Sequence, residues 1–120
     1  MARVHITVNE VWERNQLSSA FENLCVAVDA QDGAEFNMEG ADGKYLILIQ
    51  NSATAPKTVT LVKGNGLQGT CDHTEALAGS SYAFMSIDSG RFKNVSGADK
   101  GKVIIKGEDA NVKVAVFRLP

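Results

Sequence analysis

Apolar and polar residues alternate along this chain in short runs, and turn-forming residues separate the runs at intervals of roughly ten positions. Such spacing, with many β-branched residues, is typical of β-strands in sandwiches and barrels. The alternation is clearest in residues 112–119, and the continuous apolar run 45–49 suits a central strand that is covered on both faces. The pattern predicts eight or nine strands, at residues 4–8, 24–28, 34–38, 45–49, 58–62, 70–77, 82–87, 103–106 and 112–119.

The segments between these runs hold residues that favour tight turns. They are Asp32-Gly33, Asp42-Gly43, Gly64-Asn65-Gly66, Ala78-Gly79, Ser89-Gly90 and Gly107-Glu108-Asp109. Residues 9–21 are the only helical candidate, but their apolar positions fit one helical face poorly, so we expect irregular structure or a single turn of helix there. The fold class predicted is an all-β, single-domain β-sandwich of about eight to nine short antiparallel strands. A jelly roll is expected, and an immunoglobulin-like strand order is the alternative, because strand count and turn spacing suit both.

Composition is that of an ordinary globular domain. The 120 residues are 44% hydrophobic and 22% charged, which predicts one domain, residues 1–120, with an extended N-terminal arm at 1–22. A net charge of −2 gives little attraction for nucleic acid or an anionic membrane. The first residues lack the pattern of a signal peptide, and no apolar run approaches the roughly 20 residues that span a bilayer. We therefore expect the protein to bind neither nucleic acid nor a membrane, and to be synthesised in a reducing cytoplasm.

The charges are unevenly distributed along the chain. Six acidic residues precede Lys44 with no Lys or Arg among them, and five basic residues come late; they are Glu22, Asp29, Asp32, Glu35, Glu39 and Asp42, then Arg91, Lys93, Lys100, Lys102 and Lys106. The acidic and basic regions could pair within one protein molecule or between two copies of it in an assembly. The favoured interpretation is that both are ordinary solvated surfaces.

Cys71, His73 and Glu75 form the best metal candidate, because alternate positions of a strand project from one face. Zinc sites usually draw ligands from more than one segment, which favours a half-buried thiol beside polar neighbours instead. The two cysteines, Cys25 and Cys71, show no paired metal-ligand spacing, and we expect both to be reduced and buried. No metal is therefore predicted.

Gly64, Gly66 and Gly69 satisfy the GxGxxG pattern of dinucleotide-binding loops. A strand and not a helix is predicted to follow, so the loop lacks the helix N-terminus that holds a pyrophosphate. No cofactor is expected.

Other candidate sites carry weaker signals. Asp29, Asp32 and Glu35 with Gly33 lack the alternating ligands of a calcium loop, and the sequon Asn94-Val95-Ser96 is short enough to arise by chance. The basic segment 91–106 has a single aromatic residue and is interpreted as a solvated loop between strands. The candidate nucleophiles show no surrounding catalytic motif; they are Ser18, Ser80, Ser81, Cys25 and Cys71, with His5 or His73 as base. We expect no catalytic residue and no enzyme.

Several stretches together resemble small phage-encoded proteins of the head-morphogenesis group of tailed bacteriophages. They are residues 1–4, 45–51, 57–69, 89–92 and 112–120, whereas residues 12–39 match nothing recognisable. The resemblance implies a jelly-roll or immunoglobulin-like sandwich that coats a capsid, with the glycine segment acting as a hairpin and with no catalytic residues.

On this basis the sequence predicts a capsid decoration or minor head protein at the outer surface of the virion. Its expected partners are the major capsid protein and its own copies, as a homo-oligomer such as a trimer, through the N-terminal arm and a loop such as 91–102. A tail, neck or fibre component is the alternative. In another class, a soluble carbohydrate- or ligand-binding sandwich would need Trp12, Tyr45, Tyr82 and the acidic cluster to form a concave site.

Overall fold

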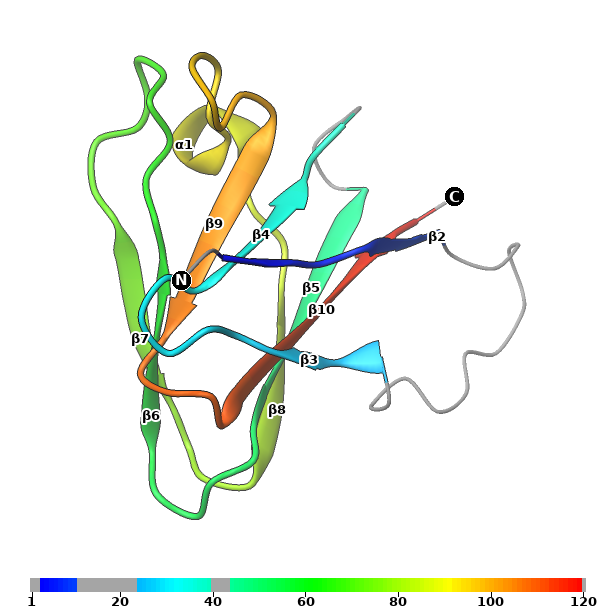
Figure 1. Ribbon diagram of the computed structural model, residues 1–120, viewed down its shortest axis with the longest axis vertical. Helices are drawn as coiled ribbons and strands as arrows, with labels where there is room; N and C mark the ends of the chain where they lie inside the picture. The colour runs from blue at the N-terminus through cyan, green and yellow to red at the C-terminus, as the bar shows by residue number, and fades with distance from the viewer. Residues whose placement is uncertain (1–2, 11–23, 40–43, 120) are drawn as a thin grey trace.

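The structure is a computed structural model that describes residues 3–10, 24–39 and 44–119. These residues form ten β-strands and one short helix (Figure 1). The strands are β1 (Val4–His5), β2 (Val8–Glu10), β3 (Val26–Ala27), β4 (Ala34–Asn37), β5 (Tyr45–Asn51), β6 (Lys57–Leu61), β7 (His73–Leu77), β8 (Ser81–Met85), β9 (Lys102–Gly107) and β10 (Val112–Arg118). The helix α1 (Ser89–Phe92) lies between β8 and β9.

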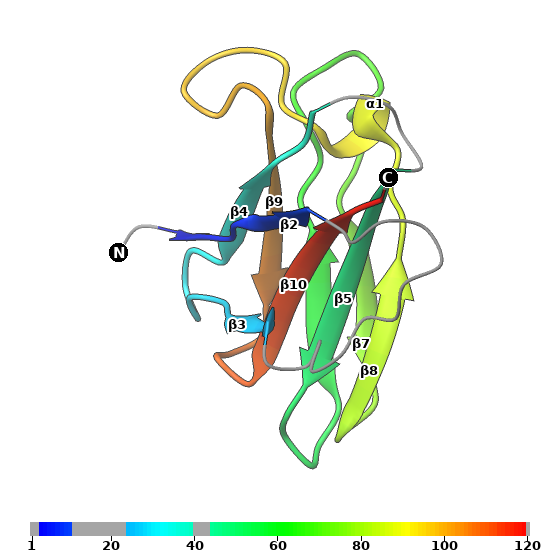
Figure 2. The same ribbon diagram turned by 90° about the vertical axis from the view of Figure 1, so that its right-hand side faces the viewer.

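The strands form two sheets that pack face to face. Sheet A has the order β1-β4-β9-β6-β7, and sheet B has the order β2-β10-β5-β8, with β3 also paired with β10. Figure 2 shows β10, β5 and β8 side by side in sheet B. All pairings among β3 to β10 are antiparallel. The predicted all-β sandwich is therefore confirmed.

Alternation along each strand places one row of side chains between the sheets. From sheet B, Val112, Val114 and Val116 are fully buried there, and Phe36 and Ile105 of sheet A are equally buried. Burying each of these side chains stabilises the fold by about 1.5–3 kcal/mol. This shared core holds the two sheets together.

Strand β5 is buried on both of its faces. Ile47 points into the main core, and its neighbour Leu48 belongs to a second buried cluster on the other face of sheet B, yet both are 0% exposed. Ala115 and Phe117 of β10 complete that second cluster. The doubly covered central strand predicted from the apolar run 45–49 is thus confirmed.

The N-terminal segment joins both sheets instead of forming one strand over residues 4–8. Strand β1 pairs in parallel with β4 in sheet A, and β2 pairs in parallel with β10 in sheet B. Figure 1 shows this segment in dark blue, crossing from one sheet to the other. At the crossing, Ile6 is buried and its backbone N–H donates to the carbonyl oxygen of Glu35 (2.8 Å). Residues 3–10 of the expected arm are therefore held by the sandwich, and 1–2 and 11–22 lie outside the described residues.

The remaining predicted strands are present with shifted ends, and two local features differ from expectation. The predicted strand 70–77 begins at His73, because the Asp72 side chain accepts a hydrogen bond from the Lys63 N–H (2.8 Å) and closes the preceding loop. The predicted turn at Ser89-Gly90 is the start of α1, where the Asp88 side chain accepts from the Gly90 N–H. Residues 9–10 of the helical candidate at 9–21 belong to strand β2, and its other residues, 11–21, are not described. Within the described part of the chain, no helix has the length and apolar character needed to cross a membrane.

Candidate interaction site between strands β7 and β8

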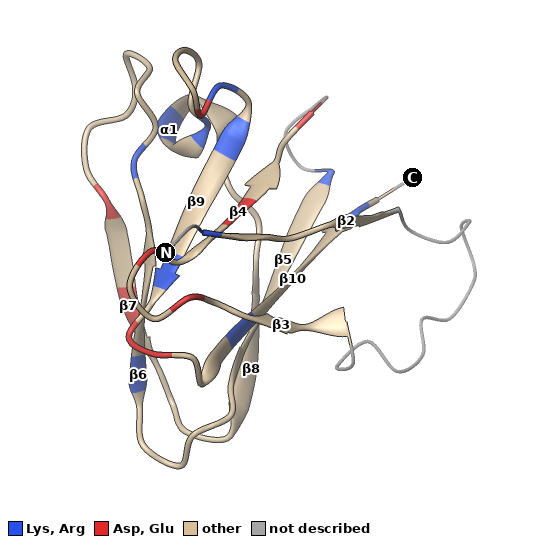
Figure 3. Cartoon of the chain, in the orientation of Figure 1, with Lys and Arg blue, Asp and Glu red and all other residues tan. Residues whose placement is uncertain are grey.

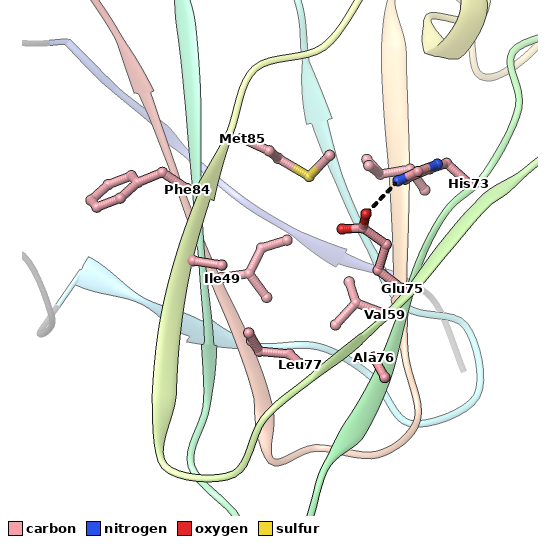
Figure 4. A pocket seen from close by; sticks show the side chains of 10 residues that line it. Ile49, Val59, His73, Glu75, Ala76, Leu77, Phe84 and Met85 are labelled. Atoms are coloured by element: carbon pink, nitrogen blue, oxygen red, sulfur yellow. Dashed lines mark ion pairs between the residues drawn. The ribbon is translucent and has the colours of Figure 1, made fainter.

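The sandwich has an opening along one side, where the end strand of each sheet lies. β7 ends sheet A and β8 ends sheet B, and residues 78–80 connect them. A cavity of about 70 Å³ lies between the two strands (Figure 4). Val59, Leu61 and Ile49 form its apolar base. We refer to this cavity, with the side chains that line it, as the β7–β8 slot.

Strand β7 brings the polar groups of the slot. His73 is paired in register with Leu61, and Glu75 with Val59, so both polar side chains lie on the inward face of β7. His73 Nε2 lies 3.3 Å from Glu75 Oε1. The Glu75 side chain is 71% exposed, which places this ion pair at the rim of the slot and leaves the carboxylate accessible to an incoming group.

Strand β8 brings apolar groups to both of its faces. Figure 4 shows the Met85 sulfur pointing into the slot and the Phe84 ring pointing away from it. Phe84 is 57% exposed and Tyr82, on the same outer face, is 46% exposed. The slot is therefore an apolar opening with a carboxylate at its rim and an exposed aromatic strand at its edge.

The metal-site candidate is only partly assembled. His73 and Glu75 do share a face, as the strand period predicted, but Cys71 precedes β7 and Arg91 Nη2 donates to its Sγ (3.4 Å). Among the described residues no group of three His, Cys, Asp or Glu side chains could hold a metal ion. The expectation of two buried thiols is also wrong for Cys71, which is exposed, whereas Cys25 is half-buried.

The glycine segment packs against the chain near α1. The Gly64 N–H donates to the Arg91 carbonyl (2.8 Å), and a Cβ on Gly64 would lie 2.4 Å from the Lys93 carbonyl oxygen. β7 follows the segment and pairs with β6, so the segment connects two antiparallel strands. Gly64 is needed for close approach of two backbones.

The residues of the calcium-loop candidate serve two separate structural purposes. Asp29 Oδ2 accepts from the backbone N–H groups of Gln31 (3.1 Å) and Asp32 (2.7 Å), and Gly33 has a φ of 79°. The turn predicted at Asp32-Gly33 is thus closed by an aspartate side chain. Glu35 lies on β4 and has other partners.

The partners of Glu35 form an ion cluster with it on the outer face of sheet A, and this cluster was not predicted from the sequence. Arg3 Nε and Lys102 Nζ each lie 2.9 Å from a different oxygen of Glu35, and Arg3 also pairs with Asp99. His5 Nδ1 is 3.6 Å from the same carboxylate. Burial alone would raise the pKa of Glu35, but hydrogen bonds from Lys102 and Arg3 outweigh it and hold that pKa below its ordinary value.

The cluster shows how one acidic and one basic residue of the unevenly distributed charges are paired. Figure 3 shows two basic positions on β9 and one acidic position on β4, which is its neighbour in sheet A. Glu35 and Lys102 thus pair within one copy. The uneven charge along the chain was the sequence signal, but the strand pairing needed to match the two residues was not visible in it.

The candidate nucleophile Ser81, the two histidines and the sequon residue Asn94 all make contacts within the fold. Ser81 Oγ donates to the Ala78 carbonyl (2.5 Å), and His5 and His73 are engaged with carboxylates. Asn94 is buried and its Nδ2 donates to the Lys102 carbonyl (3.0 Å). Ser18 and Trp12 lie outside the described residues.

The two tyrosines of the carbohydrate-site candidate lie on opposite faces of sheet B. Tyr45 is 3% exposed, belongs to the main core, and its hydroxyl accepts from the Glu39 N–H (2.7 Å). Tyr82 pairs in register with Gln50 on the outer face. They cannot contribute to one concave site.

Comparisons with protein-family models, with curated proteins and with solved structures find no match to this chain. Its geometry and the sequence resemblance are therefore the basis for a functional proposal.

Proposed function

We propose that this chain is a bacteriophage head decoration protein, a non-enzymatic module that binds the outer surface of the capsid and stabilises it. The sequence resemblance suggests the partner, the major capsid protein, and the location, the virion. A homo-oligomer such as a trimer belongs to the same proposal. The structure contributes a contact surface that suits such a role.

The strand order supports a jelly roll over an immunoglobulin-like fold. The strands β3-β10-β5-β8 and β4-β9-β6-β7 form two four-stranded antiparallel sheets. From β3 onward, each strand lies in the opposite sheet from the strand before it. The one exception is β7, which pairs with β6 in sheet A. We infer a jelly roll from this order, a fold used in viral capsids and in lectins. The fold alone does not decide the function.

The observation that carries the proposal is an apolar tip made by two loops. Leu67 is fully exposed and Val95 is 54% exposed. Asn65 joins the two loops, because its Nδ2 donates to the Ser96 carbonyl (2.9 Å) and its Oδ1 accepts from the Val95 N–H (2.7 Å). Exposed apolar side chains that lie together on the surface, unlike single ones, mark contact sites for other molecules. The tip includes part of the loop 91–102, which we expect from the sequence to contact the capsid.

The first test is the ratio of this chain to the major capsid protein in purified phage particles, measured by quantitative mass spectrometry. A ratio near unity or a simple fraction supports decoration. A trace ratio would indicate the tail, neck or fibre alternative, and absence from the particle would contradict both.

A variant tests the tip itself. Replacing Leu67 and Val95 by serine should reduce the amount of protein that binds to particles at least tenfold, because burying two such apolar side chains in a contact contributes more than the roughly 1.4 kcal/mol that corresponds to tenfold. Ala110→Ser, in the turn between β9 and β10, is the control and should bind like the unmodified protein. Equal binding of all three proteins would rule out the tip as the contact.

A further inference from the structure

Strand β8 is an edge strand, and among the described residues it lacks the usual protection. Among the described strands it pairs only with β5, and its residues 81–85 contain no charge and no proline. At the opposite ends of the sheets, the outermost strands are two or three residues long. Natural proteins protect edge strands by shortness, charge, proline or a bulge, because the free backbone groups otherwise pair with another chain. A five-residue edge without charge or proline is therefore a candidate for pairing with another strand.

A strand added beside β8 would extend sheet B over the β7–β8 slot. Its side chains would alternate between two environments, since strand residues point to opposite faces in turn. One set would continue the outer face beside Phe84, which is 57% exposed. The other set would point across the slot, which Leu77 of β7 and Met85 of β8 line with apolar side chains and where Glu75 presents its carboxylate at the rim.

These two environments define the chemistry of the added strand. Beside Phe84 an apolar side chain removes exposed aromatic surface from water. Toward β7, a long aliphatic stem that carries a positive charge fits best, because the stem contacts Leu77 and Met85 while the charge reaches Glu75. Lysine has both properties.

We propose that β8 binds an extended peptide segment of a protein partner by strand addition, with apolar residues on the outer face and lysines facing β7. Backbone hydrogen bonds supply the pairing, and the alternate side chains supply selectivity. The proposal concerns a different surface from the loop tip and does not depend on the capsid assignment.

Charge complementarity favours such a segment over a second copy of this chain. If β8 paired with β8 of a second copy, the side chains facing the slots would come from residues 81–85, none of which is cationic. Glu75 of each copy would then gain no opposite charge. A lysine-containing strand pairs this carboxylate and covers the apolar walls at once.

The test is an NMR titration of the full chain, labelled with ¹⁵N, with the peptide acetyl-Val-Lys-Val-Lys-Val-amide at low ionic strength. Binding should shift the backbone signals of 73–77 and 81–85 together. The matched peptide with Glu in place of Lys should bind at least fivefold more weakly, and a peptide N-methylated at alternate residues should not bind, because it cannot form the backbone ladder.

Two variants separate the charge contribution from folding. Glu75→Gln should weaken binding of the lysine peptide about two- to fivefold, as expected for an exposed ion pair, and the loss should shrink at high salt. Glu39→Gln, which removes an exposed carboxylate two residues after the end of β4, should leave binding unchanged. Both variants should retain the dispersed spectrum of the folded protein.

Equal affinity for the lysine and glutamate peptides, or shifts outside β7 and β8, would overturn the proposal. So would concentration-dependent dimers in sedimentation that Ala83→Lys abolishes, since the edge would then belong to a second copy. Peptide binding by a protein that is absent from phage particles would contradict only the decoration function, and the reverse result would contradict only strand addition.

Discussion

Lys102 Nζ lies 2.9 Å from Glu35 Oε2, so a lysine of β9 is paired with a carboxylate of the neighbouring strand β4. The Glu35 side chain is only 11% exposed, and Arg3 holds its other oxygen. This carboxylate therefore connects the N-terminal segment to the two strands beside it, and its ionisation affects the stability of the sandwich.

Acid should weaken the fold through Glu35. Its pKa in the folded protein is lowered from the ordinary 4.5, so it stabilises the fold above that pH, and the stabilisation is lost as the pH falls below 4.5 through the folded pKa. Glu35→Gln should cost about 1–2 kcal/mol at pH 7 and much less at pH 3. Urea unfolding of both proteins at the two pH values measures the difference. An equal difference at both pH values would contradict the role given to the charge.

Removing Arg3 should loosen β1 locally. The Val4 N–H donates to the Gly33 carbonyl (3.1 Å), and the Ile6 N–H donates to the Glu35 carbonyl. Arg3→Ala should raise the hydrogen-exchange rates of these two amides about fivefold, which corresponds to about 1 kcal/mol. The Val28 N–H, bonded to the Val112 carbonyl, is the control and should exchange as before. Unchanged rates at Val4 and Ile6 would show that the arginine does not hold the strand.

The outer face of β5 should matter as much as its inner face. Leu48→Ala and Ile47→Ala should each lower the free energy of unfolding by about 2–5 kcal/mol, because both side chains are fully buried although they point to opposite faces of sheet B. Gln50→Ala, at a half-buried position of the same strand, should cost less than about 1 kcal/mol. A small effect of Leu48→Ala would mean that the second cluster is not closely packed.

Two glycines of the GxGxxG segment should respond differently to alanine. Gly64→Ala should cost about 1–3 kcal/mol, because its Cβ would clash with the Lys93 carbonyl. Gly66→Ala should be close to neutral, since its Cβ would meet Val95 at an ordinary 3.6 Å. Thermal unfolding of the two variants compares them directly. Equal effects would contradict close backbone packing as the reason for Gly64.

Much of the fold could be predicted because the signals were local. The continuous apolar run in β5 indicated burial on both faces, and the alternation in β10 indicated a strand with an inward and an outward row. The break at Ile6 and Thr7 was not predictable in this way, since the alternation continues through it. What separates β1 from β2 is the parallel pairing of Val4 with Ala34 and of Val8 with Val116.

The candidate sites were less predictable for the same physical reason. The strand period correctly placed His73 and Glu75 on one face, but it did not show that β7 would start too late to include Cys71. The slot exists because β7 and β8 end different sheets on the same side, and the Glu35 cluster exists because β4 pairs with β9. Both depend on tertiary neighbours, which no local pattern of residues specifies.

The central position of β10 in sheet B has a consequence for the kinetics of folding. Its partners β2, β3 and β5 all precede it in the chain, and Val8 must find Val116 across almost the whole sequence. Loop closure of this length is entropically costly before any contact forms, and sandwiches of such non-local topology fold in about milliseconds to seconds. During that interval one edge of β5 has no partner, so a newly made chain is exposed to aggregation through this apolar strand.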